Sequence, residues 1–213
     1  MAKVKSGMFL GFSGTIHGMT FSQLADGTTS VREATTTTSS IPRSVAQLSA
    51  TRDTVICSNF LGHIPYYIKV GYELETKPGL NANNIAAGLV RKAITGVYPD
   101  RKIDYSKVPL TRGKMPPPED AAVTVTDIGF NFTWNPSVEK PGTHYSDQVM
   151  LMAYFPEIEK AVFVTGSAQR HRGSDLLVPN GIERGNVAEI YISFIANDRK
   201  SISNSVYLGQ INW

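Results

Sequence analysis

The stretch VAEIYISFI (residues 187–195), followed by ANDRK (196–200) and SNSVYL (203–208), decides the fold class. Every second side chain from Ile190 to Phe194 is apolar, which is the two-residue period of a half-buried β-strand. The polar run between the two stretches is of the kind that reverses a hairpin. We therefore expect an antiparallel hairpin with one face in a core and the other exposed. The polar side chains of the expected exposed face are Glu189, Tyr191 and Ser193.

Five more short apolar runs precede this hairpin and are separated by turn residues. They lie at 122–127, 128–134, 148–154, 161–165 and 176–178. Together with the hairpin they predict seven short strands, the pattern of an immunoglobulin-like or fibronectin-like antiparallel β-sandwich. Residues 122–213 are expected to form this sandwich.

The segment before the sandwich has a different character. MPPPED and the residue after it predict a stiff proline-rich linker at 115–121. Residues 41–114 predict a helical region with a strand. Its expected elements are helices at 43–61 and 81–94, a short helix or packed loop at 63–72, and a strand at 102–108.

Residues 1–40 predict a β-hairpin arm and a Thr/Ser-rich linker that covers 34–40. Asp26-Gly27 between two extended runs indicates a hairpin turn, with positive φ at both residues. An arm with so little apolar content does not stand alone, so we expect it to pack on the body or on another subunit. The fold class predicted for the whole chain is β-rich α+β: the arm, two helices and the C-terminal sandwich.

Composition narrows the function classes. Of 213 residues, 18% are charged, below the usual quarter, and the net charge of +3 is spread along the chain. Nucleic-acid binding normally needs a clustered basic face, so it is weakly supported. No signal peptide or membrane-spanning run is recognisable, which predicts a protein that is made and used without Sec export and has no membrane partner. The single cysteine, Cys57, excludes an internal disulfide and is interpreted as a small core residue.

No catalytic, cofactor or metal residue is predicted. The four histidines lack metal-ligand spacing, although His144 and His171 lie in loops that could meet in space. The glycines at 11, 14 and 18 suggest tight turns, because no Gly-Lys-Ser/Thr motif and no helix follow them. An enzyme is accordingly the least favoured class.

Several residues are candidates for contacts with a partner. The basic loop at 169–173 either forms a polar rim that faces water or contacts an acidic subunit or phosphate backbone. Arg43 and Arg52 are expected on one helix and are spaced to face one direction. The candidate contact residues are Gly11, Gly14, Phe21, Arg32, Arg43, Arg52, Arg170 and Arg172.

Short stretches along nearly the whole chain resemble those of a known protein family. They are GFSG (11–14) with Gly18, IPRSVAQ (41–47) with Arg52, VGY (70–72), AITGVYP (93–99), IDY (103–105), RG (112–113) and NSVYLG (204–209). In this order they resemble an uncharacterised family, a domain of unknown function found in Bacteroidota genomes and in phage-related sequences. The resemblance implies fold and context but no activity and no site residues.

The chain departs from this family in the N-terminal arm and at the expected helix start. The family usually has Lys at the position of Thr15, a Trp-Lys-Gly-like stretch at 21–27 and Asn at the position of Ile41. The partner surface of the arm is therefore expected to differ from that of the family.

These features favour a non-enzymatic structural or assembly protein. The specific expectation is a phage or phage-like virion component, such as a capsid accessory, head-tail connector or tail protein. Its partners would be copies of itself and other virion or assembly proteins. The alternative is a glycan- or nucleic-acid-binding module that uses the sandwich loops, where an aromatic side chain such as Tyr145 would stack on sugars or bases.

Overall fold

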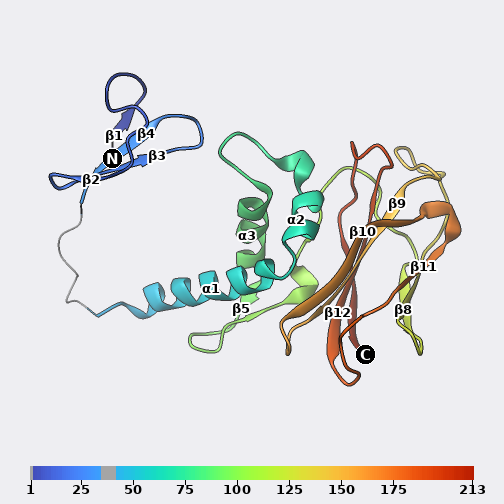
Figure 1. Cartoon of the computed structure of the whole chain (residues 1–213). Helices are drawn as coiled ribbons and strands as arrows, with labels where there is room; N and C mark the ends of the chain where they lie inside the picture. The colour runs from blue at the N-terminus through green and yellow to red at the C-terminus, as the bar shows by residue number, and fades with distance from the viewer. Residues whose placement is uncertain (1, 35–41) are drawn as a thin grey trace. The chain divides into compact units, whose positions relative to one another are not determined.

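A computed structural model describes residues 2–34 and 42–213. The predicted Thr/Ser-rich linker after Ala34, and Ile41 at the expected helix start, lie outside the described residues. The chain forms two compact units, the first of residues 1–44 with 77–79 and the second of residues 45–76 with 80–213 (Figure 1).

The first unit contains a four-stranded antiparallel sheet in the order β1-β4-β3-β2. Its strands are β1 (Ala2–Val4), β2 (Gly14–Ile16), β3 (Met19–Gln23) and β4 (Thr29–Glu33). The hairpin predicted at Asp26-Gly27 is confirmed and connects β3 to β4, but only Gly27 has positive φ (77°). The two-residue turn with positive φ at both positions lies instead at His17 (47°) and Gly18 (75°), between β2 and β3.

The second unit contains the seven strands expected from the sequence. They are β7 (Ala122–Val125), β8 (Phe130–Thr133), β9 (Gln148–Phe155), β10 (Lys160–Gln169), β11 (Ser174–Leu177), β12 (Val187–Ile195) and β13 (Val206–Asn212). They form two antiparallel sheets in the orders β10-β9-β12-β13 and β11-β8-β7. The last strand begins later than predicted, at Val206, and before it the hydroxyls of Ser203 and Ser205 accept from the backbone amides of Phe194 and Leu110.

The helical region holds three α-helices in the described residues: the two predicted, and a third where the sequence left a short helix or a packed loop open. They are α1 (Val45–Gly62), α2 (Pro65–Gly71) and α3 (Ala82–Lys92). Pro65 starts α2, where a missing amide hydrogen costs nothing, and Asn81 caps α3 by accepting from the Asn84 amide at 2.8 Å. The strand predicted at 102–108 is shorter. Only β6 (Lys102–Ile103) pairs, with β5 (Ile94–Thr95), before a 3₁₀ turn at Tyr105–Lys107.

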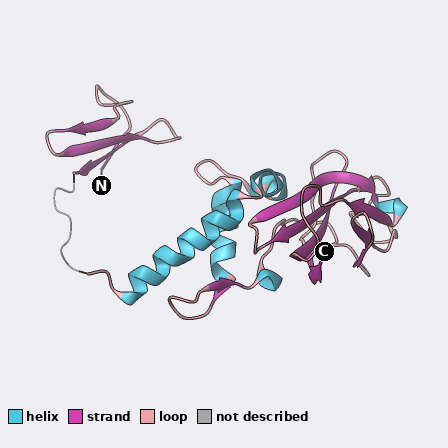
Figure 2. Ribbon diagram, turned by 60° about the horizontal axis from the view of Figure 1, so that its bottom comes forward, coloured by secondary structure: helices cyan, strands magenta, loops and turns pink. Residues whose placement is uncertain are grey.

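The second unit is built in three layers: the helices, the four-stranded sheet and the three-stranded sheet (Figure 1). Figure 2, a view from another direction, also shows the helices next to the four-stranded sheet. On β9, Val149, Leu151 and Phe155 enter the core between the two sheets, whereas Met150 and Met152 enter the core under the helices. The segment predicted as a linker, 115–121, runs within this unit.

The strand β12 is not half-exposed, contrary to the expectation from its alternating pattern. Glu189, Tyr191 and Ser193 are all buried, on the face of the sheet that the helices cover. Their polar atoms have partners: the hydroxyls of Tyr67 and Ser193 are 3.4 Å apart, and the Tyr207 hydroxyl donates to Glu189 at 2.5 Å. Buried polar groups that are hydrogen-bonded are tolerated, so this face enters a second core.

The segment 108–115 crosses between α2 and the start of the last hairpin strand. Thr111 donates its hydroxyl to the Ser203 carbonyl at 2.7 Å, and the Gly113 amide donates to the Asn204 side chain at 3.1 Å. At the end of α2, a Cβ on Gly71 would lie 2.5 Å from the Leu110 carbonyl oxygen. The crossing therefore depends on close contact between backbones.

Gly71→Ala is expected to destabilise the protein by about 1–3 kcal/mol, because the added methyl group meets backbone that cannot move aside. The control is Gly88→Ala in α3, where no atom lies within 4 Å of an added Cβ. That change should stabilise by about 0.5–1 kcal/mol, since alanine is the better helix former. Urea denaturation of both variants measures the two shifts. Equal effects would show that the close approach at Gly71 is unimportant.

Candidate functional site

The first candidate surface lies on the N-terminal unit, where large apolar side chains face solvent. They are Met8, Phe9, Leu10, Phe12, Ile16 and Met19, with Met8 79% exposed. Phe21 is half-buried, and the centroid of its ring lies 5.9 Å from that of Phe9 and 6.2 Å from that of Phe12. In residues 2–34 only Thr29 and Ser30 are buried, so this sheet has no buried apolar side chain of its own.

Three of the other predicted contact residues shape or flank this surface. Gly11 has a φ of 84° and donates its amide to the Thr29 hydroxyl at 2.9 Å, which holds the loop before β2 on the sheet. Gly14 begins β2 with a φ of 126°, a conformation that favours glycine. Arg32 is exposed on β4, opposite Thr20. The structure thus places Gly11, Gly14, Phe21 and Arg32 on one unit.

The strand β2 is the unprotected edge of this sheet. It reads Gly14-Thr15-Ile16, with no charge and no proline, and its register with β3 has no bulge. The opposite edge, β1, carries Lys3, which forms a contact of 4.0 Å with Asp26. Charges, prolines and bulges are the usual devices that keep an edge strand from pairing with another chain. They are missing from β2.

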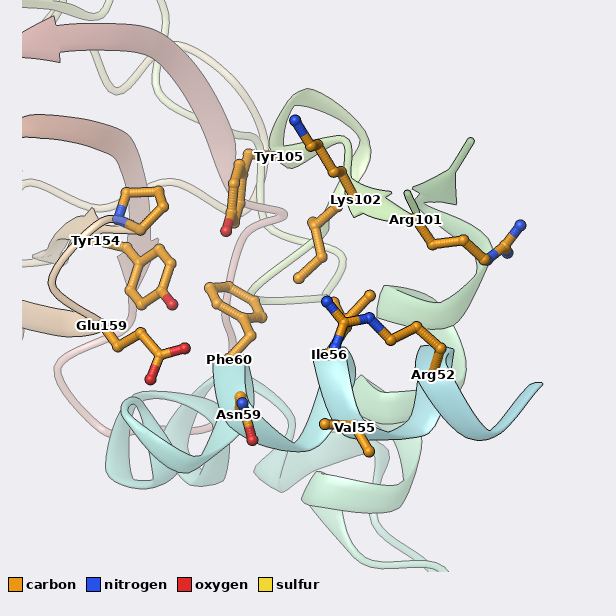
Figure 3. A pocket seen from close by; sticks show the side chains of 12 residues that line it. Arg52, Val55, Ile56, Asn59, Phe60, Arg101, Lys102, Tyr105, Tyr154 and Glu159 are labelled. Atoms are coloured by element: carbon orange, nitrogen blue, oxygen red, sulfur yellow. The ribbon is translucent and has the colours of Figure 1, made fainter. Parts of the chain in front are cut away.

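The second candidate is a cleft of about 420 Å³ in the second unit, along one face of α1 (Figure 3). The helix contributes one wall, and residues around β6 and the β9–β10 turn contribute the other. Its lining is Arg52, Val55, Ile56, Asn59, Phe60, Arg101, Lys102, Ile103, Tyr105, Tyr154, Pro156 and Glu159. Arg52 was a predicted contact residue. Arg43 was expected on the same helix, but α1 begins at Val45 and Arg43 precedes it.

Three aromatic rings line one side of the cleft. The ring centroid of Phe60 lies 4.8 Å from Tyr154 and 5.7 Å from Tyr105, and the two tyrosine centroids are 5.7 Å apart. Burial raises the pKa of both tyrosines, and the neighbouring phenol raises that of Tyr105 further. Both phenols are therefore neutral at physiological pH and available as hydrogen-bonding groups.

The charged side chains of the cleft differ in how they are paired. Arg101 is neutralised, because its guanidinium bonds both carboxylate oxygens of Asp53 and also donates to the Gly96 carbonyl at 2.8 Å. Arg52 and Lys102 are exposed, and neither forms an ion pair with any described residue. Glu159 is 57% exposed and lies 3.9 Å from His63.

The predicted basic loop at 169–173 is divided by the fold. Arg172 is exposed, whereas Arg170 is only 3% exposed and lies in the sandwich core. Its Nε is 3.1 Å from the Asp147 carboxylate, and its guanidinium carbon is 3.8 Å from the centre of the Phe194 ring. Burial lowers the pKa of Arg170 while Asp147 opposes the shift. Arg170 is thus a core residue and not a surface contact.

The two loop histidines both lie near Tyr145. The His144 and His171 rings lie 4.3 Å and 6.3 Å from the Tyr145 ring, which is 59% exposed. Within the described residues no group of three His, Cys, Asp or Glu side chains is arranged to hold a metal ion. Cys57 is buried as predicted, and burial raises its pKa, which disfavours the reactive thiolate.

Residues 11–209 match the model of a family of unknown function, DUF6266. The chain belongs to this family. The DUF6266 match extends into both units, from the loop before β2 to the last strand, β13. No curated protein and no solved structure matches the chain. None of the described helices combines the length and apolar character needed to span a bilayer.

The cleft is the feature that sequence reasoning missed. Its lining comes from three separate parts of the chain, around Phe60, Tyr105 and Tyr154. The one usable signal was the spacing of Arg52, Ile56 and Asn59 on a helix, which places them on one face. Neither Glu159 nor Lys102 belongs to a motif, so only the fold brings them to this helix.

Loss of the buried arginine is expected to destabilise the sandwich. Arg170→Gln leaves the Asp147 carboxylate without its partner inside the core, which costs about 3–5 kcal/mol. Arg172→Gln, two residues away and exposed, should change stability by less than about 0.5 kcal/mol. Urea denaturation compares them. Similar values for both variants would place Arg170 at the surface.

Buried tyrosines predict a loss of stability at alkaline pH. Burial raises the pKa of Tyr67, Tyr72 and Tyr191 above the ordinary value of 10.0. Above about pH 10 the unfolded chain releases these protons and the folded chain retains them, so stability is complete below that pH and falls as pH rises. Tyr67→Phe should flatten this dependence, measured by urea unfolding at several pH values. Tyr66→Phe, at a neighbouring exposed phenol, should leave it unchanged.

Proposed function

We propose that this DUF6266 protein is a non-enzymatic assembly protein whose N-terminal unit contacts other copies of the chain. The observation that carries this proposal is the reversed burial of residues 2–34, where large apolar side chains are exposed and none is buried. A small sheet without an apolar core is marginal in water, and exposed apolar clusters are typical of interaction sites. Burying Phe9, Phe12 and Met19 against a partner would supply the missing core.

A second copy of the chain is the partner that this surface fits. The uncharged edge β2 can extend its sheet by pairing with the same edge of another copy, and such self-complementary contacts produce closed dimers. The low charge content, 18% of residues, limits the repulsion between identical surfaces. Strand addition would also bring Ile16 of each copy next to the apolar cluster of the other.

The more specific form of this proposal is a phage or phage-like virion component, in the virion or the host cytoplasm. Capsid accessory, head-tail connector and tail proteins all act through such subunit contacts, with copies of themselves and with other assembly proteins. The support is the resemblance to phage-related sequences and the assembly surface. Electron microscopy of the purified protein tests it, because a ring, tube or shell built from such dimers through additional contacts is the expected form.

We also propose that the seven-stranded part is an immunoglobulin- or fibronectin-like sandwich. Support comes from the strand order, in which the first, second and fifth strands form one sheet and the third, fourth, sixth and seventh form the other. Relative to the immunoglobulin constant type, the fourth strand, β10, has moved to the edge of the sheet that contains β9 and β12.

A binding module for glycan or nucleic acid is the second candidate function, and the exposed Tyr145 ring supports it. Aromatic rings on loops stack on bases and sugars. Because Arg170 is buried, the basic part of this surface is reduced to Arg172 and the two histidines. Binding of single-stranded DNA at low salt, weakened by Arg172→Gln, would favour the nucleic-acid form.

Ile16→Lys is expected to disrupt self-association, because it puts a charge on the edge strand and on the apolar surface. The control is Ile128→Lys, at an exposed isoleucine in the second unit, which should leave the assembly unchanged. Light scattering after size-exclusion chromatography gives the mass of each form. A wild-type chain that stays monomeric at high concentration would overturn the proposal.

A further inference from the structure

We propose that the cleft along α1 is a binding site for a small ligand that joins an anionic group to a flat apolar group, such as an aromatic phosphate. The cleft volume of about 420 Å³ lies in the range of small-molecule sites. Every lining residue belongs to the second unit, so this site is independent of the proposed assembly surface on residues 2–34.

The apolar part of the ligand is indicated by the three aromatic rings. Phe60 and Tyr154 are almost fully buried and form the floor, and Tyr105 stands beside them. Ile56 and Val55 continue the apolar surface along the helix, and Val55 is 44% exposed. A flat group placed here would make its ring contact with Tyr105, which is half-buried, because Phe60 and Tyr154 are covered by their neighbours.

The anionic part is indicated by two cations without partners. Arg52 on α1 and Lys102 on β6 line the cleft from opposite walls, and neither forms an ion pair among the described residues. Figure 3 shows both on the side of Phe60 away from Glu159, with the Arg52 guanidinium beside Ile56 and the Lys102 ammonium directed away from it, toward the Tyr105 side. Asn59 adds a donor, whereas the phenol of Tyr105 is already hydrogen-bonded with Tyr154. A phosphate or carboxylate there would complete charge-assisted hydrogen bonds that the protein leaves open.

Two other charged groups define the limits of the site. Arg101 lines the cleft but is held by Asp53 and Gly96, so it positions the 93–103 loop and does not bind the ligand. Glu159 stands on the other side of Phe60 from Arg52 (Figure 3). Its carboxylate repels an anion, so the anionic group belongs at the Arg52 end and Glu159 weakens its binding.

The test is an NMR titration of the full-length protein with phenyl phosphate, compared with inorganic phosphate and with benzyl alcohol. We expect saturable shifts of the amides at 52–60 and 102–105 with phenyl phosphate, and binding at least about tenfold weaker for either fragment, because each loses one of the two contacts. Equal binding of inorganic phosphate, equal binding of benzyl alcohol, or no saturable shift would each overturn the proposal.

Removing a positive or a negative charge from the cleft should change the affinity for phenyl phosphate in opposite directions. The double variant Arg52→Gln, Lys102→Gln should weaken phenyl phosphate binding about tenfold, while Glu159→Gln should tighten it about twofold to fivefold, in line with the strength of exposed charge pairs. Arg43→Gln, at an exposed arginine outside the cleft, is the matched control and should change nothing. Preserved amide spectra show that each variant is folded. Unchanged affinity in the double variant would overturn the anionic role of this end.

Discussion

The structure of the second unit depends on two central strands that are buried on both faces. Along β9 and β12, alternate side chains enter two different cores, one between the sheets and one beneath the helices. Burial of each large apolar side chain contributes about 1.5–3 kcal/mol, so the helices and both sheets share the same stabilising strands. Removing the helices or the three-stranded sheet would expose one complete face of both β9 and β12. This is why helices and strands form one compact unit.

Because both faces of β12 are buried, the polar residues on its helix-facing side need hydrogen-bond partners within the protein. Ser193 meets the Tyr67 hydroxyl, the Tyr191 hydroxyl donates to the Tyr105 carbonyl at 2.7 Å, and Glu189 accepts from Tyr207. The first two bonds tie the helical layer to β12 in a defined register, and the third joins β12 to its neighbour β13. They also set the position of Tyr105, which lies at the edge of this core and forms part of the cleft wall. The cleft is thus a consequence of how the helices are anchored.

The N-terminal unit follows the opposite rule. Its backbone is well paired across four strands, but in residues 2–34 the large apolar side chains lie outside and the two buried residues are Thr29 and Ser30. A sheet of this kind has backbone hydrogen bonds but little stabilisation from apolar burial, and in our proposal a partner supplies that burial. The two units therefore divide the roles that the proposal assigns to this DUF6266 protein: one forms a stable body and the other provides contact surface.

Much of the fold follows from local signals in the sequence. Short apolar runs between turn residues predicted all seven strands, the candidate caps Asn81 and Asn83 predicted the start of α3 to within two residues, and the glycines predicted turns in the arm. Only the tertiary structure decided that Ser193 and Glu189 are buried, that Arg170 is a core residue, and that a cleft lies beside Arg52. The physical reason is that alternation shows which side chains share a face, not what covers that face. A polar or charged side chain can be buried wherever a distant segment supplies its hydrogen-bond partner.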